Sequence, residues 1–333
     1  MDLTFDDITI EPGYSPFHSR AELSTWNSDK EGKLELHLPI ISAAMDRITG
    51  PEMATYLAKK GAMGCLHRFW SIQDNLLAYQ ASPRKTFVTI GVGSGELERA
   101  EALRDAGAEY FSFDIAYAYS IHAKEMIPKI REIIGDRCLM AGNVCTGSGA
   151  SFLEELGVDL IKVGVGPSSC CATRITAGVG IPQISALIDC SESVEISIVS
   201  DGGCRTAGDI CKSLLFSDFV MIGTILAGTH YTPGQVYTNL NDDGYHKLFR
   251  GMAGSDAYRD KNGKDIPDYK APEGVTIRVP YKDARETDKL LQSIAGGIRS
   301  CLSYTGCSDI SDLQARGKWR QVSHAGYREG LTG

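Results

Sequence analysis

Short apolar, β-branched segments alternate with stretches of helical periodicity along the first two-thirds of the chain. Eight such apolar segments occur, over Leu38–Ala43, Ala62–His67, Thr86–Gly91, Tyr110–Asp114, Cys138–Gly142, Leu160–Gly164, Ile196–Asp201 and Phe219–Gly223. The stretches of helical spacing between them include Pro51–Lys60, Glu96–Ala106, Ala123–Ile134, Ala150–Leu156 and Arg205–Leu215. Near-continuous apolar strands that alternate with amphipathic helices are typical of parallel strands buried on both faces.

Eight strand–helix units predict an α/β protein with a closed (β/α)8 barrel, the TIM barrel, in a single domain over residues 1–333. The length fits, because such a barrel takes about 250 residues and the remainder can form loops. The alternative is a doubly wound open sheet, which would want a G-x-G-x-x-G turn after an early strand. That turn is missing from the sequence there, so we favour the barrel.

Most of the predicted strands are followed by a glycine, an aspartate or another polar residue. These ends include Asp46, Arg68, Gly93, Asp114, Asn143, Gly166, Asp201 and Thr224. A strand-to-helix turn uses such residues for structural reasons alone. In a barrel, however, all eight ends share one rim, and active sites are built on that rim. The repetition therefore favours a functional site there.

The pattern changes after the eighth strand. Residues 229–275 are rich in Gly, Asp, Lys and Tyr and are too long for an ordinary connection. Because loops of this length are usually lids or binding loops, we expect an active-site loop with Asp256–Lys270 as a mobile flap. A helix is predicted at Arg285–Cys301, and the final stretch of the chain is expected to be a partly ordered tail.

Composition and charge narrow the class of protein. With 43% hydrophobic and 23% charged residues, the chain has ordinary globular composition. Its net charge of −8 argues against general binding to nucleic acid or to a membrane surface. No apolar run reaches the ~18 residues of a membrane span. The N-terminus lacks the basic region and apolar run of a signal peptide, so we expect a cytoplasmic protein.

The 10 cysteines include no C-x-x-C pair, which argues against a zinc or iron–sulfur site. In a reducing compartment most of them should be small buried hydrophobic residues. One stretch stands apart, because an apolar strand runs into a Gly-Pro turn, two serines, Cys170, Cys171, Thr173 and Arg174. A cysteine on a rim loop beside hydroxyls, backbone N–H groups and an arginine is well placed to be a thiolate nucleophile.

Two neighbouring strand ends offer groups for a ribose and a phosphate. The Asp201 carboxylate suits a ribose diol, and the glycines after it let a phosphate approach the backbone. Gly223 and Thr224 offer similar groups after the eighth strand. Barrel enzymes often bind phosphate with the loops after strands seven and eight. The residues predicted to surround one phosphate are Ser169, Gly203, Gly223 and Thr224.

With these residues in view, the sequence resembles the inosine monophosphate dehydrogenase/GMP reductase family from Phe5 to about Gly306. The stretches that carry the resemblance are Pro39–Asp46, Lys162–Arg174, Gly178–Gln183, Ser200–Gly203, Phe249–Met252, Pro272–Val275 and Gly296–Arg299. The resemblance implies a (β/α)8 barrel, usually a homotetramer, that binds a purine nucleotide such as GMP or IMP together with a nicotinamide cofactor.

Several features resemble the reductase branch of this family. The regulatory domains that dehydrogenases usually carry are absent, because only a short helix is predicted between Gly61–His67 and Phe87–Gly91. Leu139–Gly147 is similar to the reductase signature of strand five, and Phe249 stands where the dehydrogenase usually has tyrosine. The segment before Glu273 lacks the Arg-Tyr pair by which the dehydrogenase activates water.

The resemblance implies a role for each matching residue. Cys171 corresponds to the nucleophile, and Thr173 and Glu273 to the pair that protonates the departing ammonia. The substrate would be bound by Ser169, Asp201, Gly202, Gly203, Gly223, Thr224, Gly251, Met252, Ala253 and Gly274. The cofactor, NADPH, would be bound by Arg68, Asp114, Ala116 and Tyr117.

The sequence also departs from the family pattern. Gly164, Gly166, Ser168 and Cys171 belong to the loop that binds a monovalent cation such as K+ in many members, but Ser168 replaces a glycine whose carbonyl often holds that cation. Tyr117 and the alanine after it replace an Asn-Gly pair near the expected nicotinamide, and Cys170 replaces an aliphatic residue. K+ binding and the choice of cofactor therefore stay open.

The reductase branch implies NADPH-dependent reductive deamination of GMP to IMP and ammonia, through a thioimidate between Cys171 and purine C2. Three alternatives remain. A dehydrogenase without regulatory domains would convert IMP to XMP with NAD+, and a reductase could act on a related purine nucleotide. A nucleotide-binding regulator that has lost catalysis is the third, although Cys171, Thr173 and Glu273 are all present.

Overall fold

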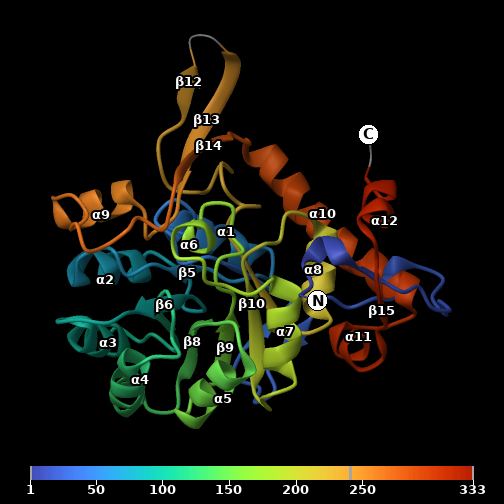
Figure 1. The fold of residues 1–333 in the computed structure, drawn as a ribbon, viewed down its shortest axis with the longest axis horizontal. Coiled ribbons are helices and arrows are strands. Elements are labelled where there is room, and N and C mark those ends of the chain that lie inside the picture. The colour runs from blue at the N-terminus through green and yellow to red at the C-terminus, as the bar shows by residue number, and fades with distance from the viewer. Residues whose placement is uncertain (1, 240–241, 332–333) are drawn as a thin grey trace.

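The computed structural model describes residues 2–239 and 242–331, and its centre is one sheet of eight parallel strands (Figure 1). The strands pair in the order β4-β11-β10-β9-β8-β7-β6-β5. They are β4 (Ile40–Ser42), β5 (Cys65–Leu66), β6 (Phe87–Ile90), β7 (Tyr110–Asp114), β8 (Cys138–Val144), β9 (Leu160–Val163), β10 (Ser197–Asp201) and β11 (Phe219–Ile222). Each lies within or beside one of the eight predicted segments.

The first and last strands of this order close the sheet into a barrel. Ser42 N donates to Met63 O at 2.9 Å, and Met63 N donates to Ile40 O at 3.0 Å. These bonds join β4 to the residues that precede β5, in parallel. The predicted (β/α)8 barrel is thereby confirmed, and the open doubly wound sheet is excluded.

Helices follow the strands and cover the outside of the barrel (Figure 1). In α10 the buried residues Leu291, Ile294, Ile298 and Leu302 recur every three or four positions, so one face packs on the protein and the other meets solvent. The barrel helices are α1 (Pro51–Lys59), α2 (Ile72–Gln80), α3 (Glu96–Asp105), α4 (Ile121–Ile134), α5 (Gly147–Glu155), α7 (Gln183–Ser191), α8 (Ala207–Leu214) and α10 (Ala284–Thr305).

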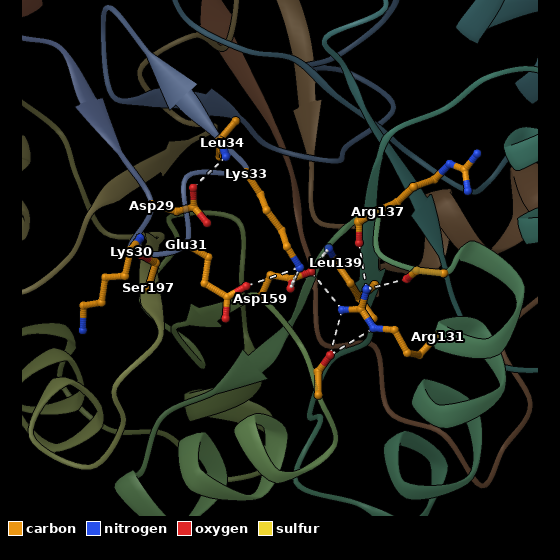
Figure 2. A network of polar contacts seen from close by, with 12 residues as sticks. Asp29, Lys30, Glu31, Lys33, Leu34, Arg131, Arg137, Leu139, Asp159 and Ser197 are labelled. Atoms are coloured by element: carbon orange, nitrogen blue, oxygen red, sulfur yellow. Dashed lines mark hydrogen bonds and ion pairs between the residues drawn. The ribbon is translucent and has the colours of Figure 1, made fainter.

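The N-terminal end of the barrel is joined to a short hairpin of β2 (Asn27–Ser28) and β3 (Glu35–Leu36). Figure 2 shows the polar network of this hairpin, centred on Asp159 at the start of β9. The Asp159 carboxylate accepts from Lys33 Nζ at 2.6 Å, from Arg131 Nη2 at 2.8 Å and from Leu139 N at 2.6 Å. Since strand ends at this face carry no catalytic groups in barrel enzymes, the network stabilises the fold.

The segment 229–275 differs from its prediction as a long loop. Within it lie β12 (Tyr237–Asn239), β13 (Asp242–Arg250) and helix α9 (Ser255–Asn262). β13 pairs with β12 on one side and with β14 (Thr276–Pro280) on the other in an antiparallel sheet, and Figure 1 shows β12 and β13 projecting away from the barrel. Because α9 buries only Ala257, its sequence is almost uniformly polar and its helix was not predicted. The mobility of Asp256–Lys270 stays a prediction.

The expectation of a partly ordered C-terminal tail is wrong. This part of the chain forms α11 (Ile310–Arg316), β15 (Trp319–Gln321) and α12 (His324–Glu329). β15 pairs antiparallel with β1 (Ile8–Ile10), so the two ends of the described chain are joined. The partner strand is about 300 residues away in sequence, and local periodicity therefore contains no signal for it. Among the described residues, no helix is long and apolar enough to cross a membrane.

Candidate active site

A cavity of about 350 Å³ opens at the C-terminal ends of the barrel strands. This is the rim on which the sequence predicts the site. The predicted site residues that line the cavity are Cys171, Thr173, Glu273, Asp201, Gly202, Gly203, Gly223, Thr224, Gly251, Met252, Ala253, Arg68, Asp114, Ala116, Gly164, Gly166 and Ser168. Ser169, Gly274 and Tyr117 do not line it.

A chain of three side chains runs from the half-buried Cys171 to Glu273. The Cys171 thiol lies 3.2 Å from Thr173 Oγ1, and Thr173 Oγ1 donates to Glu273 Oε2 at 2.8 Å. Cys171 and Thr173 come from the loop between β9 and the short helix α6 (Thr173–Thr176), whereas Glu273 precedes β14. A nucleophile, a hydroxyl and a carboxyl group are thus in hydrogen-bond sequence, as proton transfer requires.

The main chain clamps these two segments together. Ala172 N donates to Glu273 O at 2.8 Å, and Val275 N donates to Cys170 O at 3.1 Å. Gly274 lies between these bonds, opposite Cys171. A Cβ atom on Gly274 would come within 2.8 Å of Gly254 N, so only glycine fits there. The contribution of Gly274 is therefore the close approach of the two backbones.

Cys170 differs from its neighbour in burial. Its side chain is 2% exposed, and burial raises the pKa of its thiol. The Ser168 hydroxyl lies 3.5 Å from its sulfur. Because the thiolate is the reactive form of cysteine, a buried thiol with a raised pKa is a packing residue. Cys170 also lines the cavity, so it is burial and the raised pKa of its thiol that favour Cys171 as the nucleophile of the pair.

The predicted phosphate groups gather at the ends of β10 and β11. Gly202 and Gly203 have positive φ angles of 95° and 85°, a conformation that favours glycine and turns backbone N–H groups outward. Ser169 Oγ lies 2.9 Å from Thr224 Oγ1. Ser169 is exposed and does not itself line the cavity, but its hydroxyl contacts that of Thr224, which does.

A buried lysine to which the sequence assigns no role connects two of the predicted residues. Lys162 Nζ donates to Asp114 Oδ1 at 2.5 Å and lies 3.3 Å from Asp201 Oδ2. It also donates to Asn143 Oδ1, while Asn143 Nδ2 donates to Asp201 Oδ2 at 2.9 Å. Burial would lower the pKa of Lys162, but the carboxylates of Asp114 and Asp201 outweigh it and raise that pKa above its ordinary value.

The sequence does contain a signal for this network. A single charge inside an otherwise apolar, fully buried strand must be paired, and Lys162 is the only charge in β9. Both Lys162 and Asn143 line the cavity. Their effect is to fix the positions of the two carboxylates that face the predicted ribose and nicotinamide.

The predicted cofactor side of the cavity is formed by Arg68, Phe69, Asp114 and Ala116. Arg68 Nε donates to Asp114 O at 3.3 Å, and its guanidinium carbon lies 5.0 Å from the centre of the Phe69 ring. A flat ring, a cation and a carboxylate along one wall fit a nicotinamide nucleotide. Tyr117, the residue after Ala116, is 42% exposed and is not among the residues that line the cavity.

The loop predicted to hold K+ is engaged in internal bonds. The Gly164 carbonyl accepts from Asn143 Nδ2 at 2.7 Å, and the Ser168 carbonyl accepts from Cys171 N at 3.0 Å. Over residues 2–239 and 242–331 there is also no cluster of three His, Cys, Asp or Glu side chains that could hold a metal ion. Binding of K+ here stays a prediction.

One known protein family matches nearly the whole chain. Residues 2–332 match the family described as IMP dehydrogenase / GMP reductase domain. The chain belongs to the IMP dehydrogenase/GMP reductase family. Enzymes of this family are oxidoreductases that act on purine nucleotides with a nicotinamide cofactor, which agrees with the cavity and its carboxylate-lined walls.

Individual members of the family resemble the chain over nearly its whole length. GMP reductase 1 of Homo sapiens is 33% identical over 97% of this chain and 96% of that protein. The GMP reductase of Vibrio atlanticus (strain LGP32) is 32% identical over 95% and 93%. A crystal structure of inosine 5′ monophosphate dehydrogenase from Legionella pneumophila is 43% identical with a TM-score of 0.89, covering 98% of this chain and 100% of that one. The similarity therefore reaches both activities of the family.

Proposed function

We propose that the protein is a GMP reductase, which converts GMP to IMP and ammonia with NADPH. The observation that carries the proposal is the hydrogen-bonded sequence Cys171–Thr173–Glu273 at the cavity wall. Reductive deamination needs a nucleophile for purine C2 and, beside it, a proton donor for the amine that leaves. Both are present within one connected chain of side chains.

The first half of the reaction is a substitution at C2. The Cys171 thiolate attacks C2 of GMP and forms the S–C2 bond. The exocyclic amine takes a proton through the Thr173 hydroxyl from Glu273, the C–N bond breaks, and ammonia leaves. The product on the enzyme is a thioimidate between Cys171 and the purine.

The second half releases IMP. Arg68, Phe69 and Asp114, which line the cavity, would hold NADPH, and the bound cofactor would supply a hydride to C2. The S–C2 bond then breaks, and Cys171 leaves as a thiolate that is ready for the next turnover. The residues around C2 fix the position of the purine and form a water-poor wall beside it. The purine can therefore keep one orientation through both halves of the reaction.

A second group of residues is proposed to bind the other end of GMP, its ribose and phosphate. Backbone N–H groups of Gly202, Gly203 and Gly223, with the Thr224 hydroxyl, face the phosphate, and Asp201 accepts from the ribose hydroxyls. The base lies against Met252 and Ala253 after β13. Glu273 N donates to Ala253 O at 3.0 Å, so the main chain joins the base-binding loop to the segment that carries the proton donor.

An IMP dehydrogenase without regulatory domains is the second candidate, favoured by the 43% identity to the Legionella dehydrogenase. That reaction needs a group to activate water against the thioimidate. The arginine that could take this role by its place in the sequence is Arg259. It lies on α9, is exposed, and pairs with the carboxylate of Asp265 at 2.8 Å. Arg259 is not among the residues that line the cavity, which supports the reductase.

One pair of incubations separates the candidates. With GMP and NADPH, a reductase consumes the absorbance of the reduced nicotinamide and releases ammonia. With IMP and NAD+, a dehydrogenase generates that absorbance and forms XMP. Activity only in the second incubation would reverse the proposal. Activity in neither, with a third purine nucleotide active in the first format, would assign a different substrate to the same chemistry.

A further inference from the structure

Two cations from distant parts of the chain meet beside the cofactor wall of the cavity. The Arg68 guanidinium carbon lies 5.0 Å from the centre of the Phe69 ring, and Lys261 Nζ lies 4.9 Å from the same centre. Arg68 and Phe69 follow β5 and line the cavity, whereas Lys261 belongs to α9. The Lys261 ammonium is therefore brought to the edge of the site by tertiary structure alone.

The helix that carries Lys261 is anchored to the barrel. Arg250, at the end of β13, donates to Asp260 Oδ2 at 2.6 Å and through Nε to Asp46 Oδ2 at 3.0 Å. Arg250 is 8% exposed and its bond to Asp46 is shielded from solvent, whereas the Asp260 side chain at the other end of the bridge is 59% exposed. Asp260 precedes Lys261 directly, and the bridge therefore holds the lysine over Phe69.

Neither cation has a carboxylate of its own. Among the described residues, Lys261 forms no hydrogen bond or ion pair, and Arg68 makes a single hydrogen bond, to the Asp114 carbonyl. The nearby Glu96 is engaged by Arg99 at 3.4 Å and by Gly91 N at 2.6 Å. Burial and the charge of Arg68 lower the pKa of Lys261, as expected for two like charges without an anion between them.

We propose that Lys261, together with Arg68, binds phosphate oxygens of the nicotinamide dinucleotide. This inference rests on the proposed function, because it takes that dinucleotide to be the cofactor. A lysine acts as a point charge and a guanidinium as a planar donor, and both bind phosphate strongly. Two phosphate sources share this chemistry: the 2′-phosphate that only NADPH carries, and the diphosphate that NADPH and NADH have in common.

Direct binding measurements test the proposal without turnover. Isothermal titration calorimetry of the whole chain with NADPH and with NADH, each without the purine nucleotide substrate, gives the two dissociation constants. Lys261→Gln should weaken NADPH about tenfold or more, the loss of one charge-assisted contact, and Lys261→Arg should restore most of it. Lys264→Gln is the matched control, because Lys264 is an exposed lysine just beyond α9.

The outcomes are distinct. A loss for NADPH alone assigns the 2′-phosphate to Lys261, and an equal loss for NADH assigns the diphosphate; both support the proposal. Unchanged NADPH binding in Lys261→Gln, or an equal loss in Lys264→Gln, overturns it. A wild-type protein that binds neither dinucleotide overturns the cofactor assignment as well. Thermal unfolding of each variant checks that the substitutions leave the fold intact.

Discussion

At the residue scale, two adjacent cysteines separate into different roles by burial. Cys171 is half-buried and lies beside the Thr173 hydroxyl, whereas the Cys170 side chain is buried. We expect Cys171→Ser to reduce turnover at least ~10³-fold, because the alcohol is a far weaker nucleophile than a thiolate. GMP should still bind, since its phosphate and ribose contacts are untouched. Steady-state rates and calorimetry with GMP measure the two effects.

The neighbouring thiol provides the matched control. Cys170→Ser should keep turnover within a few-fold of wild type and cost about 1 kcal/mol of unfolding free energy, because it places a hydroxyl in a buried position. Full activity in Cys171→Ser would show that the wrong cysteine had been assigned. Loss of activity in Cys170→Ser alone would assign the nucleophile to Cys170.

Glu273 can be tested through the two half-reactions. Glu273→Gln removes the proton donor but keeps a group that can accept from Thr173 Oγ1. Ammonia release from GMP should fall by ~10²–10⁴-fold, as is usual for loss of a general acid. Hydride exchange between IMP and NADP+ in the absence of ammonia should change only a few-fold. Stopped-flow measurement of each half-reaction compares them, and an equal loss in both would contradict this role.

The same scale shows what one sequence can and cannot reveal about a site. Cys171 and Glu273 are about a hundred positions apart, yet both were predicted because each lies in a motif of its own. Lys162 and Asn143 were not assigned a role, because their importance comes from strands that the barrel sets side by side. Ser169 was predicted from its hydroxyl and from the family resemblance, and Tyr117 from the resemblance alone; together with Gly274, they are the predicted site residues that do not line the cavity.

At the element scale, the success of a prediction followed burial. β6, β9 and β11 are buried at every position, so their near-continuous apolar runs identified them. The arm of β12 and β13 was missed, because its own sequence is mostly polar and β14, with which it pairs, is largely exposed. β15 was missed because it forms a strand through its pairing with β1, at the other end of the chain.

The hairpin of β2 and β3 offers a test of how such distant elements are held. Asp159→Asn leaves Lys33 and Arg131 without their carboxylate at the barrel's N-terminal end. We expect a loss of about 2 kcal/mol in unfolding free energy, the cost of removing a buried charged acceptor, partly offset by the exposure of the two cations. Urea unfolding measures it.

Activity distinguishes this effect from damage to the site. Since Asp159 lies at the face opposite the cavity, the Asp159→Asn enzyme should keep its turnover rate wherever it remains folded. The exposed Glu155→Gln, on α5, is the control and should leave both properties unchanged. A wild-type unfolding curve for Asp159→Asn would mean that the network contributes nothing measurable.

At the scale of the whole molecule, a net charge of −8 coexists with a proposed site for two anionic ligands. The field of the protein as a whole therefore does not attract them. Local groups must, and the structure offers them as backbone N–H groups at Gly202 and Gly203 and as the cations Arg68 and Lys261. Affinity for both ligands should accordingly depend on short-range contacts more than on overall charge.

The stability of the molecule should depend on pH through one buried histidine. His67 is 1% exposed, its Nδ1 accepts from Phe69 N at 3.1 Å, and burial lowers its pKa from 6.5 to about 4. The unfolded chain then binds more protons than the folded one between these values. The stabilisation from neutral His67 is complete above pH 6.5 and is lost as pH falls toward about 4, amounting to about 2 kcal/mol between about pH 7.5 and about pH 5.

Comparison with a variant isolates this group, because all other titrating side chains are shared. Urea unfolding of wild type and His67→Gln at both pH values should show the wild type losing about 2 kcal/mol more than the variant on acidification. The variant is expected to be less stable at neutral pH, since Gln cannot reproduce the packing of the imidazole, whose centre lies 3.8 Å from that of the Trp70 ring. Parallel stability curves for the two proteins would mean that His67 binds its proton equally in the folded and unfolded states, and that the attraction of the Asp46 carboxylate balances the effect of burial.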